Sequence, residues 1–150
     1  MRFTGSINAK LDAKGRVFFP AVFRRQLAEG EVELIVRKDV YQPCLVVYPQ
    51  SVWDEELRRL RQSLNHWDPK EAMVFRQFMA EAESVPLDAS GRILLSKRML
   101  RMAGIDREMF FLGMDDRIEI WSCEQMEKPF LSSEELGSAL LRLMTSGPRV

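Results

Sequence analysis

Five residues that combine charge with turn-forming backbone occur twice in this 150-residue chain. Asp12-Ala13-Lys14-Gly15-Arg16 returns 76 positions later as Asp88-Ala89-Ser90-Gly91-Arg92, and four of the five positions are identical. In each copy the Asp carboxylate can accept from backbone N–H groups two residues on, and the Gly permits the positive φ of a tight hairpin loop. The Arg that follows can bond a base edge or a phosphate. The alternative is a salt-bridged hairpin with no further role.

Charge is concentrated around both copies of the turn. The chain holds 22 basic and 22 acidic residues, and a formal charge of zero argues against nucleic-acid binding. Residues 1–26, however, hold six basic side chains and one acidic, and residues 86–107 hold five basic and two acidic. Because phosphate binding depends on the local surface, a neutral chain polarised in this way can bind DNA. The alternative is a solvated charged face.

Short elements must position each turn. Pro20 predicts a helix start soon after the first turn, and Ser96 with Gly104 predicts the start and end of a helix after the second. A strand pair follows each helix; the predicted strands are 33–36, 44–48, 109–114 and 117–121. Each half is therefore a hairpin, a short helix and a hairpin. Such a unit is too small to bury a sufficient core, so we expect the two halves to share one.

Helices are predicted between and after the two halves. The capping-box pattern Ser51-Val52-Trp53-Asp54 and the pair Asp68-Pro69 predict two helix starts, which give an antiparallel helical hairpin over 54–83. Ser132 begins a third helix within the segment 128–150, which ends in a tail. The apolar stripe of this last helix belongs either to the core or to a contact between subunits.

The chain resembles the MraZ family. Phe3-Thr4-Gly5-Ser6, the run from Leu11 to Val17, Pro20 and the second turn together carry this resemblance over essentially the whole length. It implies an α+β protein in which two tandem SpoVT-AbrB-type units, 1–53 and 84–127, form a swapped-hairpin β-barrel with peripheral helices. It also implies a ring-shaped homo-oligomer and a bacterial transcriptional regulator of the division and cell-wall gene cluster.

The predicted function is sequence-specific binding of double-stranded DNA that carries short direct repeats in a promoter. Arg16 is the predicted base-reading residue, because an arginine can bond a guanine bidentately. Asp12, Gly15, Asp88 and Gly91 are predicted to build the turns. The other basic candidates would mostly bind phosphates, together with the backbone of Gly15, and are Lys14, Lys10, Arg2, Arg24, Arg25, Arg92, Lys97 and Arg98.

Enzyme chemistry is not predicted. His66 is the single histidine and lies in a turn between predicted helices, and the sequence has no nucleophile motif, phosphate-binding glycine loop or cluster of metal ligands. Cys44 and Cys123 are predicted core residues. We expect no cofactor, metal or small-molecule substrate, no membrane span, and a cytoplasmic protein associated with the nucleoid. The alternatives are a ring-forming or protein-binding structural module and an antitoxin-type AbrB regulator.

Overall fold

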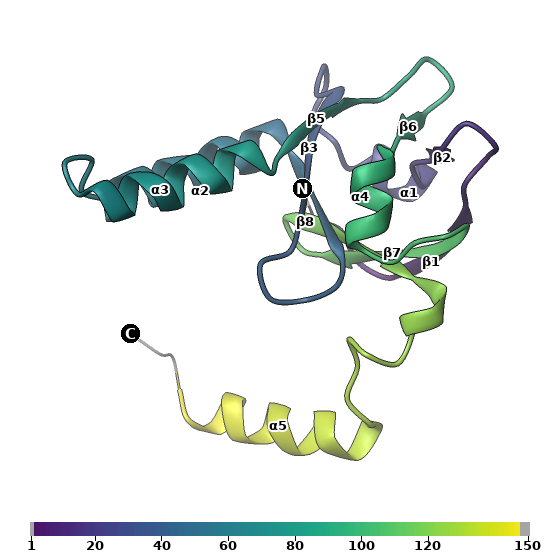
Figure 1. The fold of residues 1–150 in the computed structure, drawn as a ribbon. Helices are drawn as coiled ribbons and strands as arrows, with labels where there is room; N and C mark the ends of the chain where they lie inside the picture. The colour runs from purple at the N-terminus through teal and green to yellow at the C-terminus, as the bar shows by residue number, and fades with distance from the viewer. Residues whose placement is uncertain (1, 148–150) are drawn as a thin grey trace.

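The computed structural model describes residues 2–147 and is an α+β protein (Figure 1). Within these residues the strands form one antiparallel six-stranded sheet, in the order β1-β7-β8-β4-β3-β5, and a separate ribbon of β2 and β6. The strands are β1 (Ser6–Lys10), β2 (Arg16–Phe18), β3 (Glu33–Lys38), β4 (Leu45–Pro49), β5 (Glu83–Pro86), β6 (Arg92–Leu94), β7 (Glu108–Met114) and β8 (Arg117–Ser122). The helices are α1 (Ala21–Arg24), α2 (Gln50–Ser63), α3 (Pro69–Ala80), α4 (Lys97–Met102), the 3-10 helix Cys123–Gln125 and α5 (Ser133–Thr145).

The two halves of the chain exchange their first strands. The predicted hairpins β3–β4 and β7–β8 are confirmed, and they join side by side through β4 and β8. Strand β1 pairs with β7 of the other half, and β5 pairs with β3. The predicted loop closes at each turn, where the N–H of Asp12 donates to the Arg16 carbonyl at 2.8 Å and the N–H of Asp88 to the Arg92 carbonyl at 2.9 Å. The prediction that the strands flanking each turn pair with each other is wrong. The strand before each turn joins the large sheet, whereas the strand after it joins the ribbon, because the apolar face of each strand finds its partner in the other half.

One main core is shared by both halves, as their small size predicts. Val17 and Ile93 of the ribbon pack with Val47 and Phe111 of the sheet, and Phe23 of α1 lies in the same cluster. Strands β1 and β5 form the two edges of the six-stranded sheet. Within residues 2–147 these edges do not pair with each other, so the sheet is not closed into the barrel that the resemblance implies.

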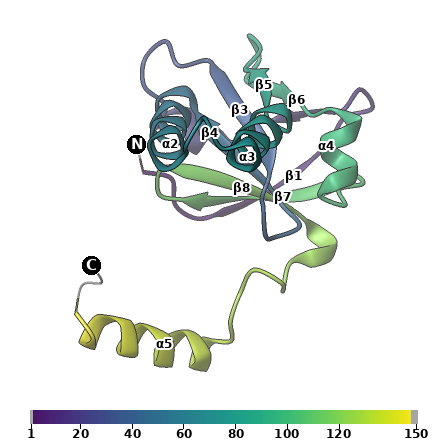
Figure 2. The same cartoon turned by 60° about the vertical axis from the view of Figure 1, so that its left-hand side comes forward.

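The predicted helical hairpin lies beside the sheet as α2 and α3, which run side by side in Figures 1 and 2. Trp53 of α2 stacks on Phe78 of α3 and packs on Tyr48 of β4. Asp68 caps α3 as predicted, by accepting from the backbone N–H groups of the first turn of the helix. The capping box at Ser51 is wrong, because α2 has no side-chain cap and both the N–H and the hydroxyl of Ser51 donate to Glu31 instead.

Helix α5 stands apart from the sheet in both views of the fold. The predicted helix start at Ser132 is confirmed, and Ser132 and Glu135 form a capping box there. Its apolar residues remain outside the core; the exposed ones include Leu136, Leu140, Leu141, Leu143 and Met144. The last three residues of the predicted tail lie outside the described part of the chain. Among the described helices, none combines the length and the apolar character that crossing a bilayer requires. Cys44 is fully buried as predicted, whereas Cys123 is half-buried, and both thiols are free.

Candidate nucleic-acid interface

The first turn is built around the carboxylate of Asp12. Its Oδ1 accepts from the backbone N–H groups of Lys14 and Arg16, both at 2.9 Å. Its Oδ2 accepts from Nε of Arg16, also at 2.9 Å. Gly15 lies at φ 85°, a conformation that L side chains rarely adopt. Within residues 2–147, neither terminal nitrogen of the Arg16 guanidinium has a hydrogen-bond partner, so the Asp12 carboxylate fixes the side chain and leaves its outer edge free.

The second turn repeats this geometry. Oδ1 of Asp88 accepts from the backbone N–H groups of Ser90 at 2.9 Å and Arg92 at 2.8 Å, and Oδ2 accepts from Arg92 Nε at 3.0 Å. Gly91 lies at φ 83°. Backbone N–H donation, most of all from the Arg that ends each turn, lowers the pKa of both aspartates. Both carboxylates are therefore ionised at neutral pH and hold their arginines.

The ribbon of β2 and β6 places both turns on one structural unit. Its register pairs Arg16 with Leu94, Val17 with Ile93, and Phe18 with Arg92. The central pair Val17 and Ile93 faces the core, so the flanking residues face outward, and Phe18 is 60% exposed. The two arginines therefore lie diagonally across the outer face, about 7 Å apart along the strand direction. Figure 1 shows both turns projecting from the same side of the molecule.

An open hollow of about 810 Å³ lies beside the first turn. Lys14 of the turn, Lys97 of α4 and Arg107 line it, together with the acidic residues Asp12 and Asp106. The hollow therefore collects cations from both halves of the chain. Arg107 was not among the candidates from sequence, although it lies in the basic segment 86–107, because only the fold brings it to the first turn.

Beside the second turn, the place that corresponds to the hollow is filled by the side chain of Arg24. Arg24, at the end of α1, donates from Nε to the carbonyl oxygen of Phe19 at 3.1 Å. Its guanidinium lies over Gly91, where a Cβ would come within 2.7 Å of Arg24 Cζ. Gly91 is consequently buried, whereas Gly15 is half-buried.

The remaining basic candidates fall into different places. Arg2 lies at the far end of β1 from the first turn, 3.8 Å from Asp115, so the structure does not bring it to the interface. Lys10 lies next to the first turn and pairs with Glu108 at 3.5 Å. Arg98 pairs with Glu83 at 3.0 Å and is partly neutralised. Arg25 and Lys97 are exposed, with no ion pair among the described residues.

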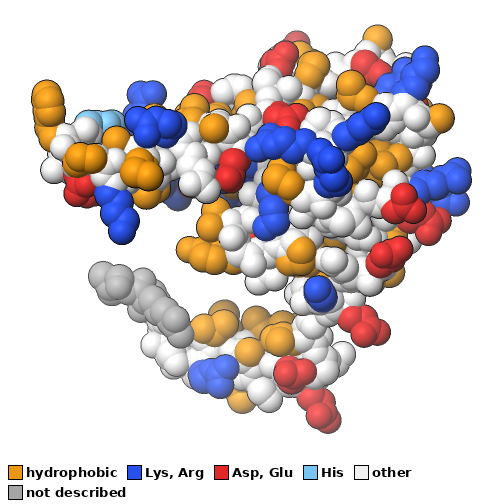
Figure 3. All heavy atoms as spheres, in the orientation of Figure 1, with side chains coloured by type: hydrophobic (Ala, Val, Ile, Leu, Met, Phe, Trp, Pro, Cys, Tyr) orange, Lys and Arg blue, Asp and Glu red, His pale blue; other side chains and the backbone are white. Residues whose placement is uncertain are grey.

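The space-filling view agrees with this distribution. In Figure 3 Lys and Arg side chains gather on the part of the surface around α4 and the two turns, with some acidic side chains among and above them and others below and at the start of α5. The face that carries the turns is thus more basic than the neutral composition of the chain indicates.

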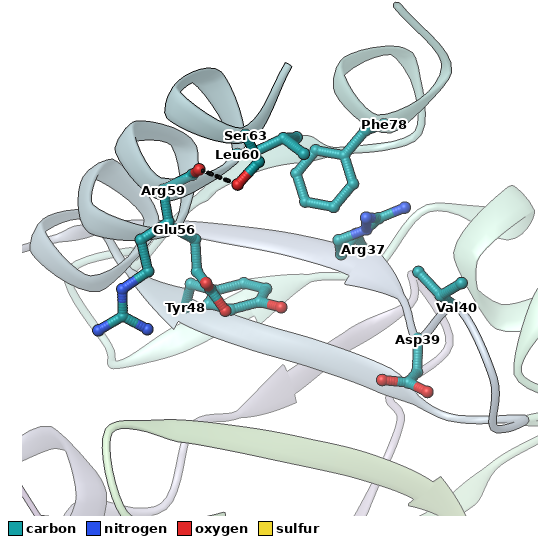
Figure 4. A pocket seen from close by; sticks show the side chains of 9 residues that line it. All are labelled: Arg37, Asp39, Val40, Tyr48, Glu56, Arg59, Leu60, Ser63 and Phe78. Carbon is teal, nitrogen blue, oxygen red and sulfur yellow. Dashed lines mark hydrogen bonds between the residues drawn. The ribbon is translucent and has the colours of Figure 1, made fainter. Parts of the chain in front are cut away.

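A second hollow, of about 320 Å³, lies between the helical hairpin and the sheet (Figure 4). Arg37 enters it from β3, with its side chain 4% exposed, its Cζ 4.0 Å from the centre of the Phe78 ring and its Nη2 3.2 Å from Glu81. Arg59 also lines it, and its acidic members Asp39 and Glu56 bond other groups. Among the described residues, Nε and Nη1 of Arg37 are buried without a hydrogen-bond partner, while Arg37 pairs with Glu81 and Glu56 pairs with Arg117.

Comparisons with known proteins match the MraZ family over the whole chain. A family model described as "MraZ protein, putative antitoxin-like" matches residues 2–77 and 78–139, so each match contains one turn. A Phocaeicola vulgatus protein named Transcriptional regulator MraZ is 50% identical over 151 residues, which cover 100% of this chain and 98% of that protein. A Bacteroides fragilis protein of the same name is 52% identical, covering 96% and 92%. One from Hydrogenovibrio crunogenus is 33% identical, covering 81% and 80%.

Proposed function

Because this chain belongs to the MraZ family, we propose that it is a transcriptional regulator that binds double-stranded DNA through its two Asp-capped turns and the ribbon between them. The observation that carries the proposal is the pair Arg16 and Arg92. Each is fixed through Nε by the aspartate of its own turn and, among residues 2–147, has no hydrogen-bond partner at the outer edge of its guanidinium. A guanidinium held in this way has the fork geometry that matches a guanine edge.

The dimensions of the ribbon suit a groove of B-DNA. Two paired strands lie about 4.8 Å apart, and the major groove, about 12 Å wide, admits a two-stranded ribbon. Arg16 and Arg92 would contact bases from the outer face. Lys14, Lys97 and Arg107 would hold phosphates, because they line one hollow beside the first turn. Lys10 and Arg25 would add phosphate contacts, whereas Arg2 would contribute little from the far end of β1.

The test of the function is Arg16→Ala, with binding to the DNA directly upstream of the chain's own gene followed by footprinting. Loss of a bidentate base contact is expected to cost about 1–3 kcal/mol for each engaged subunit. Circular dichroism should be unchanged, because the backbone bonds of Asp12 remain. Undiminished footprinting by Arg16→Ala, or loss of its fold, would contradict the proposal.

We further propose that the target is a set of direct repeats in the promoter of a division and cell-wall gene cluster, read by a ring-shaped homo-oligomer in the cytoplasm, at the nucleoid. The exposed apolar residues of α5 support assembly, since Leu141 and Met144 are 67% and 79% exposed and contiguous apolar surface of this kind is typical of protein contacts. The halves 1–53 and 84–127 act here as one DNA-binding unit, with 54–83 and 128–150 outside it.

Repetition of the interface around a ring would explain how a neutral chain binds tightly. Tethered sites raise avidity by roughly 10²–10⁴ without any new contact. Light scattering should give an oligomer, and a duplex with several boxes should bind far more tightly than a duplex with one. A monomer in solution, or equal affinity for the two duplexes, would refute the ring assembly. Neither result would affect the Arg16→Ala test, which concerns the DNA contact of a single subunit.

A further inference from the structure

We propose that Arg24, from the helix of the first half, supplies the second turn with the cation that this turn lacks at Ser90. Each end of the ribbon would then present one fixed arginine and at least one further cation to DNA. The inference rests on the proposed DNA-binding function and assigns Arg24 a place in it. The site it completes is built from both halves of the chain.

From residue 6 to residue 38 the first half corresponds to the second at an offset of 76 residues. The carbonyl of Gly91 accepts from Phe19 N–H at 2.9 Å, and the carbonyl of Gly15 accepts from Leu95 N–H at 3.0 Å, so the two ends of the ribbon are equivalent. Their neighbours are not. Lys14 corresponds to Ser90, and Arg24 corresponds to Leu100. The first turn therefore combines its own lysine with a leucine on the adjacent helix, and the second combines its own serine with an arginine there.

Arg24 is held at a position where its charge can replace that of the lysine missing from the second turn. Its Nε bond to the Phe19 carbonyl holds the guanidinium directly over Gly91, within the space that a Cβ would need. The side chain is nevertheless exposed, and within residues 2–147 no carboxylate forms an ion pair with it. A charge fixed by one carbonyl and left without a counter-ion is available to a phosphate.

The net charge of the turn residues, counted with Arg24, is equalised as a result. In the first turn the charges are those of Asp12, Lys14 and Arg16, which leave one positive charge. In the second they are those of Asp88 and Arg92, which cancel, and Arg24 restores one positive charge. DNA that lies along the ribbon would thus meet positive charge at both ends, although the sequence of the second turn is less basic and the hollow at the first turn adds Lys97 and Arg107 against Asp106.

A purely structural alternative exists, in which Arg24 only braces the Gly91 turn. The experiment separates the two roles by moving the charge. Arg24→Leu introduces the residue found at the equivalent position 100, and Ser90→Lys introduces the residue found at position 14, so the double variant makes the second turn resemble the first. Arg76→Leu, at an exposed position on α3, is the control for loss of one surface charge.

Binding is measured for the full chain with the duplex directly upstream of its own gene, as a function of salt. One phosphate contact contributes about −0.9 to the slope of log K against log[salt]. Arg24→Leu should therefore reduce the slope by about 0.9 per engaged subunit and weaken binding roughly eight-fold at 0.1 M salt. Adding Ser90→Lys should restore both values. Arg76→Leu should leave both unchanged.

The outcomes distinguish this inference from the proposed function. Wild-type slope and affinity in Arg24→Leu, alongside loss of binding in Arg16→Ala, would overturn the role of Arg24 alone. A weakened Arg24→Leu that Ser90→Lys does not restore would assign Arg24 to bracing and also overturn the inference. If Arg16→Ala binds like the wild type, the proposed function itself fails.

Discussion

The Asp12 carboxylate performs two tasks that one substitution can separate. Its Oδ1 holds the backbone of the turn, and its Oδ2 holds Arg16 Nε at 2.9 Å. In Asp12→Asn the amide oxygen can keep both backbone bonds. The amide NH₂ then faces the Nε–H of Arg16, and because two donors cannot bond each other, the arginine must leave its fixed position. Asp12→Ala removes both tasks together.

The magnitudes follow from these contacts. The ion pair is partly exposed, with side-chain exposures of 31% for Arg16 and 37% for Asp12. Its loss should cost about 0.2–1 kcal/mol, and for a chain of this size that lowers Tm by no more than about 4 °C. Asp12→Ala also loses two backbone bonds, a loss comparable to that of a helix cap, about 0.5–2 kcal/mol more. An unfixed Arg16 must be ordered on binding, at about 0.5–1.5 kcal/mol, which weakens DNA binding about 2- to 12-fold per engaged turn.

Thermal unfolding and DNA titration on the same samples check this. Asp12→Asn should bind clearly more weakly than the wild type with a small change in Tm, and Asp12→Ala should lose both. Asp88→Asn should repeat the pattern at the second turn, and Asp54→Asn on α2 serves as the control. Wild-type affinity in Asp12→Asn would show that the carboxylate does not orient Arg16. Equal Tm losses in the two Asp12 variants would show that the amide does not keep the backbone bonds.

Other perturbations give further tests. Gly15→Val and Gly91→Val place a β-branched residue at positive φ and should each cost about 1–3 kcal/mol in chemical denaturation; unchanged midpoints in both would contradict the turn geometry. Glu81→Ala leaves the buried guanidinium of Arg37 without its carboxylate and should lower Tm more than Arg37→Met, which removes the charge as well; the reverse order would refute that pairing. The pKa of both turn aspartates is lowered from the ordinary value of 3.8, so their stabilisation is present at neutral pH and is lost as the pH falls below 3.8 toward the lowered pKa. Acid should therefore lower the Tm of the wild type more than that of a variant with both aspartates replaced by asparagine, and equal pH profiles would argue against it.

Local sequence determined the features of this protein that depend on near neighbours. The repeated five residues predict a turn held by its own aspartate, and Asp12 and Asp88 accept the backbone bonds of their turns in the structure. The hairpins β3–β4 and β7–β8 and the helix starts at Asp68 and Ser132 are also as predicted. Each of these rests on bonds within a few residues, or on a short connection, and is therefore encoded in a short stretch of chain.

Tertiary structure alone decided how the halves combine. The same apolar alternation that makes β1 a strand does not say whether it pairs with β2 or with β7, because many partners offer equivalent backbone bonds and burial of the shared core selects among them. The sequence grouped Arg2 with the basic residues of the first turn, but the extended strand β1 separates the two, and Arg2 lies beside Asp115. The sequence also predicted a helix cap at Ser51, but Ser51 donates to Glu31 instead, a residue 20 positions away. The approach of Arg24 to Gly91 joins residues from opposite halves. No local pattern contains that contact, because it exists only once the exchanged strands have brought the two halves around one core.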